Sequence, residues 1–342
     1  ELQGLIGGYL AAAQSEHPQV AAAISDHYKP VGQGDEVPTD PVTVAVSLAD
    51  KLDSIAGFFA IHERPTGSKD PFALRRAALG VIEIALKAGL RMDLGHVTAV
   101  AAGGYTRQWI APGAGDEDIA LHRERWSADL FREVPEFFVD RLKVQQRSAG
   151  IRHDLIDAIY SLDSRSDDIV ENLARVRSLQ AFVETPEGAD LLAGYKRAAN
   201  ILKKEGWPAS SSPLVGEDQG GPPAASAAEE SLPAADAAGP HPNPSPQGGG
   251  TPIPLSYTPE PAEAALIAAL DSAEPEAGAA VEREDFEAAM RALATLRGPV
   301  DAFFTEVIVN DPDQHKRAAR LDLLARMRDA VHRVADFSRI EG

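Results

Sequence analysis

The chain of 342 residues contains no cysteine, which excludes both a disulfide framework and a thiolate metal site. It has no apolar run long enough to span a membrane, and its first residues, ELQGLIGGYL, lack the basic and then apolar pattern of a signal peptide. We therefore expect a cytoplasmic protein with no membrane partner. Because the first residue is Glu1 rather than Met, we also expect a fragment or a processed chain.

Motifs that could support catalysis by this chain alone are also missing. The sequence has no Walker loop, no Rossmann glycine pattern, no His-Glu-x-x-His zinc motif and no serine in a nucleophile elbow. We therefore predict no catalytic residue, no metal site and no cofactor bound by this chain.

Basic residues are outnumbered by acidic ones, 33 to 52, which gives a formal net charge of −19. This balance argues against a general nucleic-acid binder, since such proteins usually carry a basic excess. It does not exclude local basic patches, because only the surface that faces phosphates needs to be positive.

Strand-like alternation is scarce, and apolar residues recur at helical spacing over most of the chain. The sequence therefore predicts an all-α fold. Helices are expected at 42–61, after an Asp40-Pro41 cap, and from about 311 to the C-terminus. The segment 119–150 is expected to form two helices that meet near Pro135, because proline removes a helical hydrogen bond.

Residues 206–256 have a different composition, rich in proline, glycine, serine and alanine, with hardly any large apolar side chains. Such a segment buries too little surface to offset the entropy of ordering. We predict a disordered, functionally inert linker or insert.

The segment RPTGSKDPFALRRAALG, residues 64–80, is the most specific string in the chain. Asp70 and Pro71 form a helix-start pattern, and Phe72 and the apolar residues after it follow helical spacing. Arg75 and Arg76 lie near the positive end of the helix dipole, where cations do not stabilise the helix. This placement is consistent with two ordinary surface arginines or with contact to an anion.

Two acids lie close together in SLADKLDSI, residues 47–55, and could hold a metal through oxygen ligands or simply form a solvated face. These acids are Asp50 and Asp53, and the string resembles the last aspartate-bearing helix of HD-type metal phosphohydrolases, which implies a metal-binding aspartate on this helix. That site also needs upstream histidines and a His-Asp pair, but His17 and His27 are not followed by aspartate. The chain's His153-Asp154 pair lies far downstream, so the ligand set is incomplete.

Two further basic clusters occur in the first 206 residues. They contain Arg141, Lys143, Arg147 and Arg152, and then Lys196, Arg197, Lys203 and Lys204 beside Tyr195. Each is consistent with a solvated helix face, but together, with a tyrosine available for stacking, they favour RNA backbone contact.

Several strings together resemble the β subunit of bacterial heterotetrameric glycyl-tRNA synthetase, in its C-terminal half. They include ELQGLIGGYLA, SLADKLDSIAGFFAI, RPTGSKDPFALRRAALGVIEI, LLAGYKRAANIL and the tail from LRGPVDAFF onward. The resemblance implies an HD-like helical domain at 1–110, a helical body at 111–205, the insert at 206–256, and a C-terminal anticodon-binding helical domain at 257–342.

The resemblance also implies a division of labour. The α subunit would carry most of the chemistry with ATP, Mg and glycine, while this chain binds tRNA(Gly) as part of an α2β2 assembly. Lys69, Arg75 and Arg76 would then face the acceptor side of the tRNA. Contact with the tRNA backbone would come from a body cluster made of Arg141, Lys143, Arg147, Arg152, Tyr195, Lys196 and Arg197. The anticodon stem would lie near Lys316, Arg317, Arg320 and Arg333. A metal phosphohydrolase and a helical scaffold without an RNA role remain the alternatives.

Overall fold

A computed structural model describes residues 2–32, 34–109, 116–162, 166–207 and 257–341, with side chains left out for 106–131. Across these ranges the chain forms thirteen α-helices and one short 3-10 helix, and the only β-type pairing is two isolated bridges. The all-α prediction is confirmed. No helix in the described ranges is long and apolar enough to cross a bilayer.

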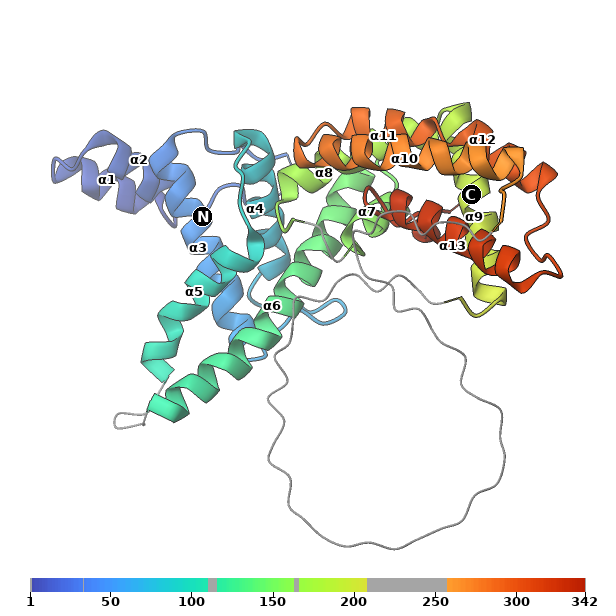
Figure 1. The fold of residues 1–342 in the computed structure, drawn as a ribbon. Helices are drawn as coiled ribbons and strands as arrows, with labels where there is room; N and C mark the ends of the chain where they lie inside the picture. Colours follow the sequence, from blue (N-terminus) through green and yellow to red (C-terminus); the bar gives the residue numbers. More distant parts are fainter. Residues whose placement is uncertain (1, 33, 110–115, 163–165, 208–256, 342) are drawn as a thin grey trace, which may run out of the picture.

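The first six helices pack together at one end of the molecule (Figure 1). The central member, α3, contacts the helices on either side of it and also α5 and α6. The bounds are α1 (Leu5–Ala13), α2 (Pro18–Asp26), α3 (Pro41–Ala60), α4 (Leu74–Ala88), α5 (Leu94–Trp109) and α6 (Asp116–Arg147).

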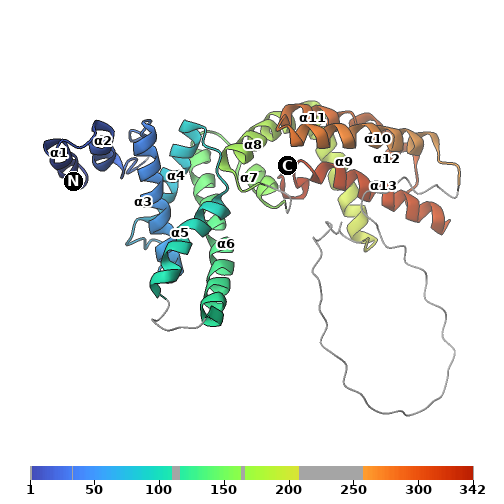
Figure 2. The same cartoon turned by 60° about the vertical axis from the view of Figure 1, so that its left-hand side comes forward.

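The later helices form a second group, which lies beside the first (Figure 2). Here α13 packs on α9 and α10, while α8 contacts α7, α9 and α11. The bounds are α7 (His153–Tyr160), α8 (Ile169–Val183), α9 (Pro186–Lys204), α10 (Pro261–Glu282), α11 (Phe286–Ala294), α12 (Arg297–Glu306), α13 (Gln314–His332) and the 3-10 helix η1 (Phe337–Arg339).

The expected break at Pro135 is wrong, because α6 continues through it as one helix. A proline in a helix removes one hydrogen bond but keeps a helical φ angle. Its neighbours Val134 and Phe138 are 0% and 1% exposed. Burial on both sides of the proline favours the continuous helix despite the lost bond.

Arg91, between α4 and α5, links the two groups. Its guanidinium forms ion pairs with Asp168 at 2.6 Å, Glu171 at 3.1 Å and Glu284 at 2.8 Å. The backbone N–H of Leu94 also donates to the carbonyl of Asp167. These contacts join α4 and α5 to α8 and to the turn before α11.

The four-part division predicted from sequence remains a prediction. Helix packing adds that α6 belongs with α3–α5, while α7–α9 pack with the C-terminal helices. Nearly all of the predicted insert, residues 208–256, lies outside the described residues.

Candidate nucleic-acid interface

Segment 64–76 is a tightly bonded turn that leads into α4. The Asp70 carboxylate accepts hydrogen bonds from the backbone N–H groups of Leu74 (2.8 Å) and Arg75 (3.0 Å). Asp70 therefore caps the helix as expected, but α4 begins at Leu74 and not at Pro71. The shift arises because Ala73 adopts the left-handed conformation, with φ of 56°, which cannot continue an α-helix.

The two arginines of this segment have different roles. The Arg75 guanidinium donates to the carbonyl of Gly67 at 2.8 Å, so it fastens the turn to the helix. Its assignment to phosphate contact stays a prediction, since Arg75 is only half-buried and a guanidinium has five N–H donors. Arg76 and Lys69 are exposed, and they remain candidates for contact with an anion.

The body cluster is largely engaged within the protein. Lys143 pairs with Asp157 at 2.5 Å, and Arg152 pairs with Asp154 and donates to the carbonyl of Glu341. Arg141 lies against the Phe137 ring, and Arg147 is exposed.

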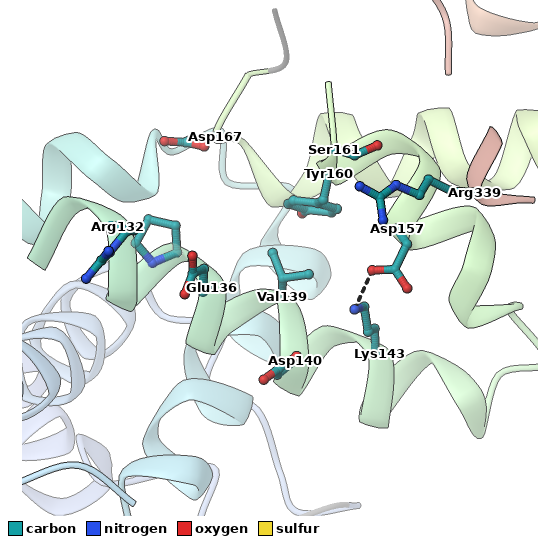
Figure 3. Close-up of a pocket in the computed structure, with 11 residues that line it drawn as sticks. Arg132, Glu136, Val139, Asp140, Lys143, Asp157, Tyr160, Ser161, Asp167 and Arg339 are labelled. Carbon is teal, nitrogen blue, oxygen red and sulfur yellow. Dashed lines mark ion pairs between the residues drawn. The ribbon is translucent and has the colours of Figure 1, made fainter. Parts of the chain in front are cut away.

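Lys143 and Asp157 also line a cavity of about 510 Å³ between α6, α7 and Arg339 near the C-terminus (Figure 3). Acidic residues line this cavity together with basic ones, and the acidic residues include Glu136, Asp140 and Asp167. Such a mixture gives a phosphate chain no uniformly positive surface.

Tyr195 was expected to stack on RNA, and this expectation is wrong because the side chain is 1% exposed. Its hydroxyl lies 2.5 Å from Nε2 of His332, and burial raises the pKa of the tyrosine. Tyr195 thus joins α9 to α13. The next two residues of α9 differ in exposure: Lys196 is half-buried, and Arg197 is exposed, with its guanidinium 4.4 Å from the Phe304 ring centroid.

Arg320 was expected near an anticodon stem, but its side chain is 0% exposed. The guanidinium pairs with Glu260 at 2.6 Å and Asp311 at 2.9 Å, lies 3.6 Å from Glu263, and donates to the carbonyl of Ile308. A fully buried cation with these partners stabilises the fold and cannot meet tRNA, so this assignment is wrong.

The other cations of α13 lie at opposite ends of the helix. Lys316 and Arg317 are in its first turn, whereas Arg333 is its exposed C-cap. Sixteen residues of helix separate Arg317 from Arg333, about 24 Å. The structure therefore does not bring Arg333 into one site with the first two.

The start of α13 meets the end of α9 through an ion pair between Arg317 and Glu205. Beside Glu205, Lys203 and Lys204 are exposed in the last turn of α9. The ammonium of Lys316 lies 5.8 Å from the Tyr257 ring centroid. We call Lys203, Lys204, Lys316 and Arg317 the α9–α13 end.

A second cavity, of about 800 Å³, lies between α2, α3 and α5. His27, Asp50, Asp53 and His96 line it, among mostly apolar side chains. No group of three or more side chains able to hold a metal occurs in the part of the chain that the structure describes. His153 and Asp154 lie on α7, which does not line this cavity, and the Asp154 carboxylate forms an ion pair with Arg152. The structure does not favour the metal phosphohydrolase alternative.

The whole chain aligns with two curated proteins, each named glycine–tRNA ligase beta subunit. It is 45% identical to the protein of Rhodospirillum centenum and 44% identical to that of Phenylobacterium zucineum, over 342 residues in both cases. A family model described as glycyl-tRNA synthetase beta subunit matches residues 1–161, and one described as DALR anticodon binding domain matches 245–337. Over its whole length the chain is therefore similar to glycyl-tRNA synthetase β subunits. It spans about 40% of the length of these relatives.

The matched ranges place the candidate surfaces of this chain in two different regions. Segment 64–76 lies inside the β-subunit match, while Lys316 and Arg317 lie inside the DALR match. Helix α9, which supplies Lys203 and Lys204, falls between the two matches. The α9–α13 end is therefore formed where the DALR match packs on a helix that precedes it in sequence.

Sequence reasoning missed two features of these surfaces. Phe72 was counted among the apolar positions of a helix, but it lies in the turn before α4 and is 43% exposed. The ion pair between Glu205 and Arg317, which joins the end of α9 to the start of α13, was not predicted. The exposure of Phe72 follows from the left-handed conformation of Ala73, which no local pattern indicates. The partner of Arg317 lies more than a hundred residues away, so no local pattern indicates it either.

Proposed function

We propose that this chain is the tRNA-binding part of a glycine–tRNA ligase β subunit. It holds tRNA(Gly) while an α subunit carries most of the ATP- and Mg-dependent glycylation chemistry, in an α2β2 assembly of the cytoplasm. The chain itself contributes binding and positioning, not catalytic groups or a bound cofactor.

The observation that carries this proposal is the similarity of the whole chain to part of two proteins named glycine–tRNA ligase beta subunit. The DALR match over 245–337 supports a role in tRNA contact, since its description names anticodon binding. The cations of the α9–α13 end lie in and beside that match. Because tRNA phosphates attract cations wherever the local surface is positive, this end is compatible with RNA contact on a chain of charge −19.

A salt series of equilibrium binding to a tRNA(Gly) transcript tests the proposal. Replacing Lys203, Lys204 and Lys316 with alanine removes three exposed or half-exposed cations and should weaken binding at low salt. Each lost phosphate contact should flatten the plot of log K against log salt by about 0.7–0.9. A matched control is Arg291→Ala, which removes an exposed cation from α11 in the same match.

We expect the control to bind with the wild-type salt slope. Equal slopes for the triple variant and wild type would remove the α9–α13 end from the interface. A wild-type chain that binds no tRNA even at low salt would support the helical scaffold alternative instead.

A further inference from the structure

An aromatic ring is displayed at the surface of segment 64–76. Phe72 stacks on Phe58 of α3, with ring centroids 3.8 Å apart and planes 17° from parallel. Phe58 packs against the hydrophobic core, whereas Phe72 remains 43% exposed. The second ring is therefore held on the first and still presents much of its apolar surface to solvent.

Backbone and side-chain hydrogen bonds hold the chain on both sides of Phe72. Thr66 and Lys69 exchange backbone hydrogen bonds at 3.0 and 2.8 Å, and Arg75 fastens the same turn through Gly67. Asp70 binds the first N–H groups of α4 on the other side. A turn fixed in this way keeps Phe72 in place before any partner arrives, so binding costs less ordering entropy.

The exposed charged side chains of segment 64–76 are positive. Lys69 and Arg76 are exposed within the same segment, and the carboxylate of Asp70 is occupied by two backbone N–H groups. The chain as a whole is strongly acidic, so a local positive surface is unusual here. An exposed aromatic face next to cations matches a ligand that is both planar and anionic, and an unpaired nucleotide has both properties.

We propose that Phe72 is a stacking platform for an unpaired base of bound RNA, with Lys69 and Arg76 contacting the phosphates on either side of it. This inference rests on the proposed tRNA-binding function and deepens it. It names an unpaired nucleotide, rather than a duplex region, as the ligand of this surface.

The test compares two substitutions of the same ring. Phe72→Leu keeps an apolar contact with Phe58 but removes the π face, whereas Phe72→Tyr keeps that face. The probes are an RNA hairpin with a short unpaired 3′ tail and the same hairpin with a blunt end. We expect Phe72→Leu to weaken binding of the tailed hairpin roughly tenfold or more, and to leave the blunt hairpin unchanged.

Two further readouts separate stacking from charge and from folding. Phe72→Leu should not alter the salt slope, while Lys69→Ala should flatten it by about 0.7–0.9. A 2-aminopurine base in the tail should lose fluorescence on binding to wild type and to Phe72→Tyr, but not to Phe72→Leu. Thermal unfolding of each variant checks that the fold is kept.

Equal affinity of wild type and Phe72→Leu for the tailed hairpin, with salt-dependent tRNA binding intact, would overturn this inference alone. Failure of the wild-type chain to bind any RNA at low salt would overturn the proposed function as well. If Phe72→Leu instead weakened only the association with an α subunit, the ring would belong to a protein interface and the inference would be wrong.

Discussion

Segment 64–76 and the α9–α13 end both present exposed cations, but the protein builds them in different ways. The first is made by neighbours in sequence, since Arg75 donates through its backbone N–H to Asp70 and through its guanidinium to Gly67. The second is assembled by tertiary packing, since Arg317 reaches Glu205 across 112 residues. Substitutions elsewhere in the fold should leave a locally built surface unchanged. An assembled surface should change when the core beneath it is altered.

The largest effect is expected at the buried arginine under the assembled surface. Arg320→Ala would leave Glu263, which is 1% exposed, without its cation, together with Glu260 and Asp311. We expect the free energy of unfolding to fall by about 3–5 kcal/mol. Urea denaturation measures this, and Arg333→Ala, at an exposed site on the same helix, should change it by less than about 0.5 kcal/mol. A loss for Arg320→Ala as small as that of its control would contradict the assembled design.

The next effect concerns Lys51, which fills the space between α3 and α4. The Lys51 ammonium donates to the carbonyls of His27 (3.1 Å) and Lys29 (3.0 Å) and to the hydroxyl of Ser47 (2.8 Å). Its carbon chain fills the space in front of Gly80 on α4, where an added Cβ would lie 2.7 Å from Cε of Lys51. Lys51→Met should cost about 1–3 kcal/mol, because the carbonyl of His27 loses this donor, while the carbonyl of Lys29 still accepts from the Ser47 hydroxyl at 2.7 Å.

Lys51 also gives a pH dependence of stability. Burial lowers its pKa from 10.5 to about 8, so between these two pH values the unfolded chain binds more protons than the folded chain. The free energy of unfolding should therefore rise with pH across that window through this group, and Lys51→Met should lack that rise. Urea denaturation of both proteins at pH 7.5 and 10 makes the comparison. Parallel pH profiles would show that Lys51 keeps its ordinary pKa.

A smaller effect should follow from loosening the locally built turn. Asp70→Ala removes the acceptor for the N–H groups of Leu74 and Arg75, and capping changes of this kind cost about 0.5–2 kcal/mol. We expect a matching loss in thermal unfolding and weaker binding of the tailed hairpin. Asp313→Ala, which removes the corresponding cap of α13, should cost a similar amount of stability without changing hairpin-tail discrimination. Equal effects of the two variants on discrimination would mean that segment 64–76 has no special role.

The smallest stability effect is expected at the surface pair that joins α9 to α13. Arg317 is 45% exposed, and exposed ion pairs contribute about 0–1 kcal/mol. Arg317→Ala should therefore leave unfolding nearly unchanged while reducing tRNA affinity and its salt slope. A large loss of stability would show that the pair holds the two helices together, which would weaken its assignment as a contact.

Local patterns were sufficient to predict the elements whose bonding is local. The helix at 42–61 was predicted from its cap and its period, and α3 spans Pro41–Ala60 with Asp40 accepting from Val42 and Thr43. The sequence also predicted a capped helix in segment 64–80, although α4 begins at Leu74 and not at Pro71.

The remaining differences all involve contacts between distant segments. Helix α13 packs on both α9 and α10, so a second face is buried in addition to its apolar stripe. Arg320 on that face finds its partner Glu260 sixty residues away, and no helical periodicity in α13 could indicate this. For the same reason, the burial of Tyr195 against His332 could not be predicted from α9 alone.

The most direct test of tRNA recognition is equilibrium binding of the chain to tRNA(Gly) across a salt series, beside the same tRNA with an exchanged anticodon. We expect tighter binding of the glycine tRNA and affinities that fall steeply as salt rises, because cationic surfaces contact phosphates. Weak binding that is equal for the two tRNAs at every salt concentration would contradict the claim that this chain recognises tRNA.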